Sequence, residues 1–309
     1  MTQPLTSIII PCYNSEAFVG EAIESALGQS YSAVEVIVID DGSTDGSVGV
    51  LESFGDRIRW ETGPNRGACA ARNRGIAMAK GELIQFLDAD DLLHPEKLER
   101  QVAELERSGA DMVCCFGQCD DPTNTMDGMY RRRYDGGDAV RFVLRGVLQT
   151  SAPLHRRENL EAVGGFREDL PCSQERDLHL RLACAGLRFH QLPTVLYTVR
   201  RMAGSVSSDS VKVLDQHVKI LWPAYERLRE RGELSDERAR AFAGLLASDA
   251  RAYLRQGHAD RAAKYFAEAR KMHPDGGLSA AYQGPARWLR RMLGPRATER
   301  LVGMKRRMV

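Results

Sequence analysis

Short apolar runs alternate with longer stretches of helical periodicity over the first 116 residues. The β-branched and aliphatic runs predict five strands, at residues 7–11, 34–40, 57–60, 82–88 and 110–116. The helical patterns predict helices over residues 15–29, 67–79 and 95–107. Ser15 is expected to cap the first of these helices and Pro95 to open the third. This alternation indicates an α/β fold with a mostly parallel sheet flanked by helices.

The pattern changes twice further along the chain. Residues 117–137 are rich in Asp, Pro, Asn and Gly, which predicts a loop or a small hairpin. From about Val211 helix formers dominate, so a boundary is expected near residues 205–215. We therefore divide the chain into an α/β domain (1–208), a helical region (209–284) and a tail (285–309).

The helical region contains one set of residues with tetratricopeptide-like spacing. They are Ala250, Tyr253, Gly257, Ala262, Phe266, Ala269 and Pro274. A repeat solenoid needs about three such units, and one is visible. The spacing therefore favours a single helix pair packed on the main domain over a peptide-binding repeat.

Charge is distributed unevenly along a chain whose formal net charge is +1. No Lys or Arg precedes Arg57, whereas residues 286–309 hold eight basic residues and one acidic residue. This basic segment also carries apolar residues such as Trp288, so it fits either the surface of an anionic membrane or packing on the protein itself. We favour peripheral membrane contact; nucleic-acid binding lacks any accompanying motif.

Other features of the sequence bear on its location. No run of 18 apolar residues exists to span a membrane, and the first residues lack the basic region of a secretory signal. The seven cysteines are odd in number and show no paired C-x-x-C spacing, as expected of reduced thiols. The sequence thus predicts a cytoplasmic protein with peripheral contact at the inner face of the cell membrane.

Two acidic clusters follow predicted strands. Asp40 and Asp41 end the strand 34–40, and Asp88, Asp90 and Asp91 follow the strand 82–88. Open α/β sheets bind ligands beyond the carboxyl ends of their strands. Carboxylates that lie this close repel one another, and a hard divalent cation such as Mn²⁺ or Mg²⁺ would offset the repulsion. For Asp91 the simpler interpretation, a cap on the following helix, is favoured.

Six motifs occur in one order between residues 5 and 208. They are SIIIPCYN, VIVIDDGSTDGS, NRGACAARNRGIAMAKGE, FLDADD followed by HPEKL, VGGF, and QERDLHLRLACAG. In this order and spacing the chain resembles the family 2 glycosyltransferases, which are nucleotide-sugar enzymes of the GT-A fold. The resemblance implies a GT-A domain followed here by a C-terminal helical region.

The resemblance also implies a role for particular positions. The nucleotide-binding residues that it implies are Pro11, Tyr13, Asp41, Arg72 and Asp88. Pro11 and Tyr13 would line the base, and Asp41 would accept a hydrogen bond from a uracil-type imide. Asp88 and Asp90 would form the family's D-x-D motif, with Asp90 ligating the Mn²⁺ or Mg²⁺ that bridges the diphosphate.

Sugar transfer by displacement also needs a base for the acceptor hydroxyl. The family uses the Asp of a Glu-Asp pair, and Gln174 and Glu175 occupy the matching positions, so Glu175 is the expected base. Its alternative role is to begin a helix, where an acidic side chain is favourable; Asp177 is expected to be structural. A second departure is Met202, where many relatives carry His. Arg200 or Arg201 would then contact phosphate, or else remain a surface charge.

These observations favour an inverting, metal-dependent, non-processive glycosyltransferase. The donor would be a nucleotide sugar, with a UDP-sugar favoured, and the acceptor a hydroxyl of a glycan or lipid-linked molecule. One alternative is a catalytically silent relative that binds nucleotide or glycan as a scaffold. Another is a sugar-nucleotide pyrophosphorylase, but the chain lacks the Gly-rich, basic loop that would hold a triphosphate.

Overall fold

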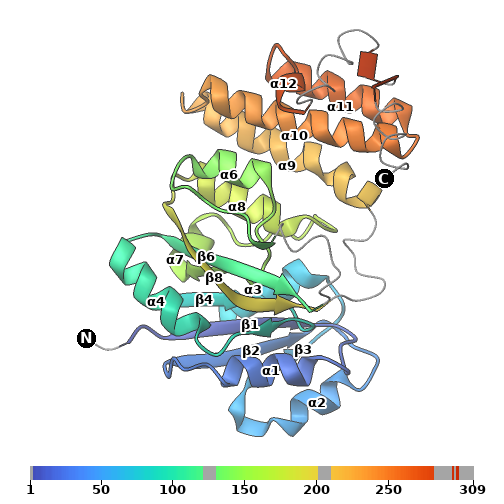
Figure 1. The fold of residues 1–309 in the computed structure, drawn as a ribbon. Coiled ribbons are helices and arrows are strands. Elements are labelled where there is room, and N and C mark those ends of the chain that lie inside the picture. The colour runs from blue at the N-terminus through green and yellow to red at the C-terminus, as the bar shows by residue number, and fades with distance from the viewer. Residues whose placement is uncertain (1–2, 121–129, 201–209, 282–293, 296, 299–309) are drawn as a thin grey trace. The chain divides into compact units, whose positions relative to one another are not determined.

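The computed structural model describes residues 3–120, 130–200, 210–281, 294, 295, 297 and 298. Contacts divide the chain into two compact units (Figure 1). The first, the α/β unit, comprises Met1–Ala139 and Gly146–Ser205, and the second, the helical unit, comprises Val140–Arg145 and Val206–Val309. The division of the sequence into functional domains at 208 and 284 stays a prediction.

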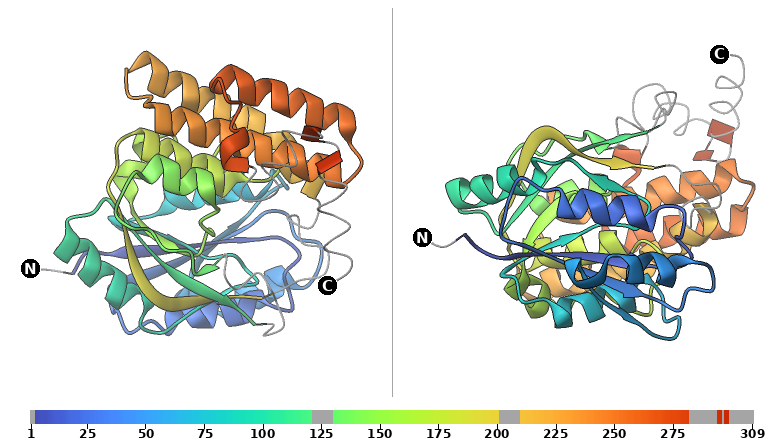
Figure 2. Two further views of the ribbon diagram at one scale, coloured as in Figure 1. Left: turned by 45° about the horizontal axis from the view of Figure 1, so that its top comes forward. Right: turned by 90° about the horizontal axis from the view of Figure 1, so that it is seen from below.

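Eight strands form one sheet among the described residues of the α/β unit (Figures 1 and 2). They are β1 (Thr6–Cys12), β2 (Val34–Asp40), β3 (Arg59–Thr62), β4 (Leu83–Phe86), β5 (Leu92–Leu93), β6 (Met112–Cys119), β7 (Pro153–Arg156) and β8 (Phe189–Val199). Their order is β3-β2-β1-β4-β7-β6-β8-β5. Neighbouring strands from β3 to β4 are parallel, as are β6 and β8, whereas β7 runs antiparallel between β4 and β6. The α/β fold is therefore confirmed, with a mixed sheet.

The helices of the described residues are α1 (Val19–Leu27), α2 (Ser47–Ser53), α3 (Ala68–Met78), α4 (Lys97–Ser108), α6 (Ala139–Arg145), α7 (Arg157–Ala162), α8 (Gln174–Cys184), α9 (Ser210–Glu230), α10 (Asp236–Arg255), α11 (Ala259–Met272) and α12 (Leu278–Ala281). The three helices expected in the first third of the chain are present as α1, α3 and α4; α2 in the same part of the chain was not predicted, and several more helices follow residue 130. A 3₁₀ turn at Gly55–Arg57 precedes β3, so the strand predicted at residues 57–60 begins two residues later.

Alternation along β1 determines which helices cover each face of the sheet. Ile8 and Ile10 belong to a core cluster that includes the buried faces of α1 and α4. Ile9 points the other way, since successive strand residues face opposite sides. There it meets α3, where a Cβ built on Gly75 would lie 2.3 Å from the Ile9 Cγ2 atom. Gly75 thus permits the close approach of α3 to β1.

Two helix starts differ from the prediction. Ser15 does not cap α1, because its hydroxyl donates to the Tyr13 carbonyl and the helix begins at Val19 without a side-chain cap. Pro95 lies before the first residue of α4, whose N-cap is Glu96. In both places a hydrogen-bonded turn precedes the helix. The sequence pattern does not distinguish such a turn from the first turn of the helix.

The strands β7 and β8 were not predicted. β7 contains four residues, PLHR, too few to show alternation. β8 contains Pro193. The register between β8 and β6 shifts beside it, because the consecutive β6 residues Cys115 and Phe116 pair with Leu192 and Val195. Such an irregularity tolerates Pro193, which elsewhere in a sheet would remove a ladder hydrogen bond.

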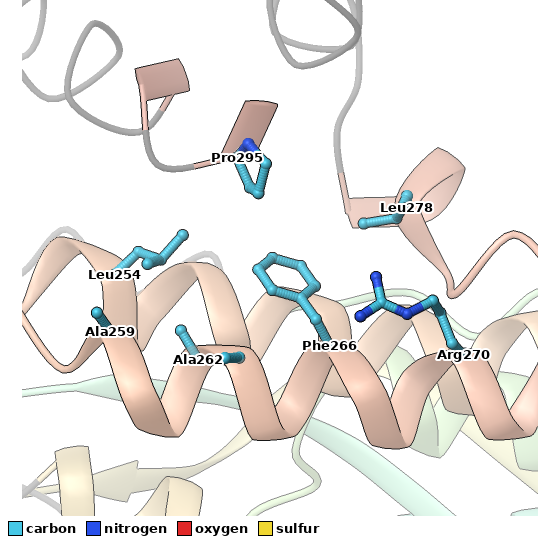
Figure 3. Close-up of a pocket in the computed structure, with 8 residues that line it drawn as sticks. Leu254, Ala259, Ala262, Phe266, Arg270, Leu278 and Pro295 are labelled. Atoms are coloured by element: carbon cyan, nitrogen blue, oxygen red, sulfur yellow. The ribbon is translucent and has the colours of Figure 1, made fainter. Parts of the chain in front are cut away.

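The helical unit contains the residues with tetratricopeptide-like spacing. Those on α10 and α11 are buried, and Gly257 turns the chain between the two helices with φ of +86°. An apolar cavity of about 260 Å³ lies along α11, with Phe266 on its wall and the Arg270 side chain near Leu278 (Figure 3). Of the helices in the described residues, none is both long and apolar enough to cross a membrane.

Replacing Gly75 by Ala is expected to lower the free energy of unfolding. The new methyl group would collide with the β-branched side chain of Ile9, and overpacking of this kind costs about 1–3 kcal/mol. Chemical denaturation measures the change. The matched control is Gly49→Ala on α2, where no atom lies within 4 Å of the added Cβ; it should be neutral or stabilising by up to about 1 kcal/mol. Equal stability of the two variants would contradict the assigned packing of α3.

Candidate active site

The two acidic clusters lie at one edge of the sheet. β2, β1 and β4 are parallel neighbours, so their carboxyl ends point the same way. Asp41 follows β2, and Asp88 comes two residues after β4. Pro11 lies near the end of β1 and Tyr13 directly follows the strand, so both are at the same edge. Tyr13 is 49% exposed. The sequence-predicted nucleotide residues are thus gathered at the edge where such sheets bind ligands.

Asp41 connects this edge to the start of α3. Its backbone amide donates to the Cys12 carbonyl at 2.8 Å. Its carboxylate accepts the backbone N–H groups of Arg66 and Gly67, each at 2.7 Å. Each oxygen keeps a second lone pair, so a contact with a base imide is compatible with this role and stays a prediction. The same carboxylate therefore fixes the loop that leads into α3.

The Asp88–Asp91 segment forms a tight turn in which the carboxylates have different surroundings. The Asp91 amide donates to the Asp88 carbonyl at 3.0 Å. Asp91 is buried and accepts from the Ser151 hydroxyl at 3.1 Å and from the Arg200 amide at 3.3 Å. It does not cap α4, and that expectation was wrong. Asp91 instead attaches the turn to β8 and to the segment before β7.

Burial raises the pKa of Asp90, and the neighbouring charge of Asp88 raises it further. Burial also raises the pKa of Asp91 well above its ordinary value, again with contributions from Asp88 and Asp90. Burial is the larger cause of both shifts, and the repulsion between carboxylates that the sequence suggested adds to it.

The donors present fit a divalent cation that binds through few protein ligands. No group of three or more His, Cys, Asp or Glu side chains in the described ranges is arranged to hold a metal. The Asp90 carboxylate accepts no side-chain hydrogen bond from the described residues, and one oxygen of Asp88 is already bonded to Arg72. Mg²⁺ and Mn²⁺ typically take one or two carboxylates and complete their shell with phosphate and water. The pair Asp88 and Asp90 suits that pattern.

Arg72, on α3, lies behind the turn. Its side chain is 4% exposed, and Nη2 donates to Asp88 Oδ1 at 2.6 Å. The guanidinium also stacks on the Phe166 ring, with Cζ 5.3 Å from the ring centroid. Sequence reasoning missed Phe166, although it is the last residue of the VGGF motif. The ring and the ion pair together fix the guanidinium behind Asp88.

Glu175 lies in the first turn of α8. The residue before the helix, Ser173, has φ of +60°, a left-handed conformation that is uncommon outside glycine. The Glu175 side chain is half-buried, and burial raises its pKa. The charge of Asp88 adds to this effect, whereas a backbone hydrogen bond and the Arg72 guanidinium oppose it. Glu175 is thus a carboxylate whose proton affinity depends on Asp88 and Arg72 as well as on its own burial.

Asp177 has the structural role expected of it. It is buried and accepts from Arg181 Nε at 2.7 Å and from Arg167 Nη1 at 3.4 Å. Arg181 in turn donates to the carbonyls of Val163 and Gly165, both at 2.7 Å. This chain of contacts attaches α8 to the glycine turn before Phe166.

Arg200 is engaged by protein groups. Its side chain donates to Glu21 at 2.6 Å, to the Asp90 carbonyl at 2.5 Å and to the Phe18 carbonyl at 3.2 Å. The guanidinium therefore attaches the acidic turn to α1, and the phosphate contact suggested for it stays a prediction. Arg201 and Met202 lie outside the described residues.

Comparison with known proteins identifies the family. The family model described as "Glycosyl transferase family 2" matches residues 7–162. A Bacillus subtilis protein named uncharacterized glycosyltransferase EpsJ is 30% identical over 235 residues, which is 72% of this chain and 68% of that protein. The chain therefore belongs to glycosyl transferase family 2, and the resemblance seen in its motifs is confirmed.

Other relatives are longer proteins. An uncharacterized glycosyltransferase of Rickettsia felis is 29% identical over 243 residues, covering 72% of this chain and 38% of its own length. A Rickettsia bellii counterpart is 31% identical over 232 residues, which is 33% of its length. The chain thus spans roughly a third of these relatives.

Solved structures show the same fold. The Staphylococcus aureus TarS 1–349 complex with UDP-GlcNAc superposes with a TM-score of 0.76 at 16% identity, covering 97% of this chain and 92% of that one. The mannosyltransferase PcManGT of Pyrobaculum calidifontis, in complex with GDP-Man and Mn²⁺, has a TM-score of 0.62 at 20% identity and covers 97% and 87%. At this level of identity the likeness establishes the GT-A fold.

Replacing Asp41 by Asn is expected to destabilise the α/β unit. An amide can accept one of the two backbone N–H groups through its oxygen, so the other loses its acceptor, at a cost of about 1–2 kcal/mol. Thermal melting measures the loss. Asp56→Asn, at an exposed position in the 3₁₀ turn, is the matched control. An Asp41→Asn variant as stable as the control would show that these two hydrogen bonds do not stabilise the loop before α3.

Proposed function

We propose that the chain is an inverting, metal-dependent glycosyltransferase that moves one sugar from a nucleotide diphosphate donor to an acceptor hydroxyl. The observation that carries this proposal is the arrangement of the Asp88–Asp91 turn, Arg72 and Glu175 within one compact unit. A UDP-sugar is the favoured donor. The UDP-GlcNAc and GDP-Man complexes of proteins with the same fold support a nucleotide sugar as the class of donor.

Asp90 and the free oxygen of Asp88 would hold Mn²⁺ or Mg²⁺. When bound, the cation supplies Lewis-acid stabilisation of the negative charge that develops on the departing diphosphate. The Mn²⁺ in the mannosyltransferase complex supports this cofactor class. Pro11, Tyr13 and Asp41 would bind the base at the ends of β1 and β2, with Arg72 near the nucleotide.

Glu175 would act as the general base. Its carboxylate would accept the proton of the acceptor hydroxyl while that oxygen bonds to the anomeric carbon of the donor sugar. The bond from this carbon to the diphosphate oxygen would break in the same step, and both electrons would leave with the nucleotide. A single displacement of this kind inverts the anomeric configuration. A raised pKa suits a base that must take up a proton near neutral pH.

The acceptor would be a glycan or a lipid-linked molecule, with one sugar added per encounter. The basic composition of residues 286–309 supports a cytoplasmic protein in peripheral contact with an anionic membrane. A catalytically silent nucleotide-binding scaffold is the second candidate, because Glu175 stands where relatives use Asp. The two candidates differ in whether the protein transfers sugar at a rate that depends on Glu175.

Replacing Asp90 by Asn is expected to weaken the Mn²⁺-dependent part of UDP binding by roughly tenfold or more, since an amide oxygen carries no charge to offset the cation. Isothermal titration of UDP with and without Mn²⁺ measures this, with Asp56→Asn as the control. UDP affinity without metal should change little. An Asp90→Asn protein that retains the full Mn²⁺ enhancement would remove Asp90 from the site.

Replacing Glu175 by Gln is expected to lower the transfer or donor-hydrolysis rate by about 10²–10⁴-fold, because the amide cannot accept the hydroxyl proton. UDP–Mn²⁺ affinity should stay at the wild-type value. Glu161→Gln, an exposed acid on α7, is the matched control, and Glu175→Asp should retain a substantial share of the rate. Nucleotide release from a panel of nucleotide sugars provides the assay. An active Glu175→Gln protein would exclude the assigned base, and a wild type inactive on every donor would favour the scaffold.

A further inference from the structure

A second cavity lies within the helical unit, between α6 and the first half of α10. Its volume is about 740 Å³, which falls in the range of roughly 300–1,000 Å³ that is typical of small-molecule sites. Contacts place Val140–Arg145 of α6 in the same compact unit as α10, so one unit forms the whole cavity. None of its described lining residues belongs to the candidate active site. The cavity is therefore a separate candidate for ligand binding.

Both acidic side chains among the described residues of its wall have cationic partners. Glu237 on α10 accepts a hydrogen bond from Arg141 on α6. Asp236 Oδ2 accepts from Arg240 Nη2 at 2.9 Å, and the other oxygen of Asp236 lies 3.1 Å from His273 Nε2. The protein thus engages the two carboxylates of the cavity itself.

The arginines of the wall outnumber these carboxylates by three to two. The Arg145 side chain is exposed at the end of α6 and makes no hydrogen bond or ion pair with any described residue. Among the described residues Arg240 donates through Nη2 alone, and its side chain is 48% exposed. A guanidinium presents five N–H donors in a planar fork that matches a carboxylate or a phosphate. Arg145 and Arg240 therefore offer unused donors to an oxyanion in this cavity.

The rest of the wall suits a ligand that has both hydroxyl groups and C–H surfaces. Ser248 Oγ donates to the Gly244 carbonyl at 2.9 Å, so its oxygen keeps lone pairs that can accept from a ligand hydroxyl. Leu144 and Leu245 supply apolar surface, and the small side chain of Ala241 leaves room on α10. A sugar has both kinds of surface, whereas a hydrocarbon chain would leave the polar groups of the wall without partners. The wall therefore favours a sugar that carries an anionic group.

We propose that this cavity binds an acidic sugar, whose carboxylate or phosphate group is held by Arg145 and Arg240. Ser248 would accept a hydrogen bond from one of the sugar hydroxyls. The acidic sugar would be a unit of the acceptor glycan, so that the helical unit selects the acceptor and the α/β unit carries the chemistry. The identity of the ligand as acceptor rests on the proposed function, whereas binding of an acidic sugar does not.

The test is isothermal titration of the full chain with glucose 6-phosphate and with glucuronate, in the absence of donor and metal. Glucose provides the neutral comparison, and inorganic phosphate provides the anion without a sugar. At least one acidic sugar should bind about tenfold or more tightly than glucose and than inorganic phosphate, because it alone offers both an oxyanion and a ring. The tighter of the two acidic sugars identifies the preferred anionic group.

Replacing Arg145 by Met should weaken binding of that acidic sugar by about tenfold, since the variant removes a charged donor. Ser248→Ala should weaken it by about two- to tenfold and leave the affinity for inorganic phosphate unchanged. The matched control is Arg229→Met, which removes an exposed guanidinium of α9 from outside the wall and should bind as the wild type does. Thermal melting establishes that each variant is folded.

Three results would overturn the proposal. The first is that neither acidic sugar binds more tightly than glucose. The second is a folded Arg145→Met protein with wild-type affinity, which would leave Arg145 only the role of a favourable cation at the end of a helix. The third is inorganic phosphate that binds as tightly as the acidic sugars, which would indicate a general anion site. Failure of the proposed function is distinguishable, because an inactive wild type or an active Glu175→Gln protein would leave these titrations unchanged.

Discussion

Mutual repulsion of the carboxylates that follow β4 is the constraint on which the candidate site depends. Asp88, Asp90 and Asp91 lie within four residues at one edge of a buried sheet, and each has a different surrounding. Asp88 is paired with Arg72, and Asp91 turns inward to accept hydrogen bonds. In the part of the chain that the structure describes, no side chain donates a hydrogen bond to the Asp90 carboxylate, although Arg200 donates to the Asp90 carbonyl. The fold thus provides hydrogen-bond donors for the carboxylates of Asp88 and Asp91, and the Asp90 carboxylate is the one that suits a cationic ligand.

A buried polar network between α4 and the strands β4 and β6 supports this arrangement. Lys97 is fully buried, and its ammonium donates to the side-chain oxygens of Gln85 and Gln101 and to the Ala152 carbonyl. Burial lowers the pKa of Lys97. Gln85 also donates to the carbonyl of Ser151, whose hydroxyl reaches Asp91. Buried polar groups whose hydrogen bonds are all made rigidify their surroundings. The Asp88–Asp91 turn that follows β4 is therefore supported through Ser151.

The local sequence pattern predicted the elements along which burial is uniform or regularly periodic. The apolar runs 8–10 of β1 and 36–39 of β2 reflect strands covered on both faces, and α3 was expected within one residue of its ends. β7 and β8 escaped prediction because four residues, or a strand interrupted by a proline, show no regular alternation. Motif spacing identified Arg72 and Glu175 as candidates, but it could not show which groups surround them. Phe166 lies 93 positions from Asn73, and Arg200 reaches Glu21 across 179 positions. Contacts of that range depend on the completed fold.

The glutamate at position 175 has a geometric consequence for the acceptor. α8 cannot move back to absorb the extra methylene, because Asp177 and Arg181 attach the helix to the carbonyls of the glycine turn. The adjustment therefore has to come from the side chain, whose carboxylate reaches about 1.5 Å further from the backbone than that of an aspartate. Reacting groups tolerate little misplacement. If Glu175 is the base, the acceptor hydroxyl should accordingly bind about one bond length further from α8 than in a relative with Asp.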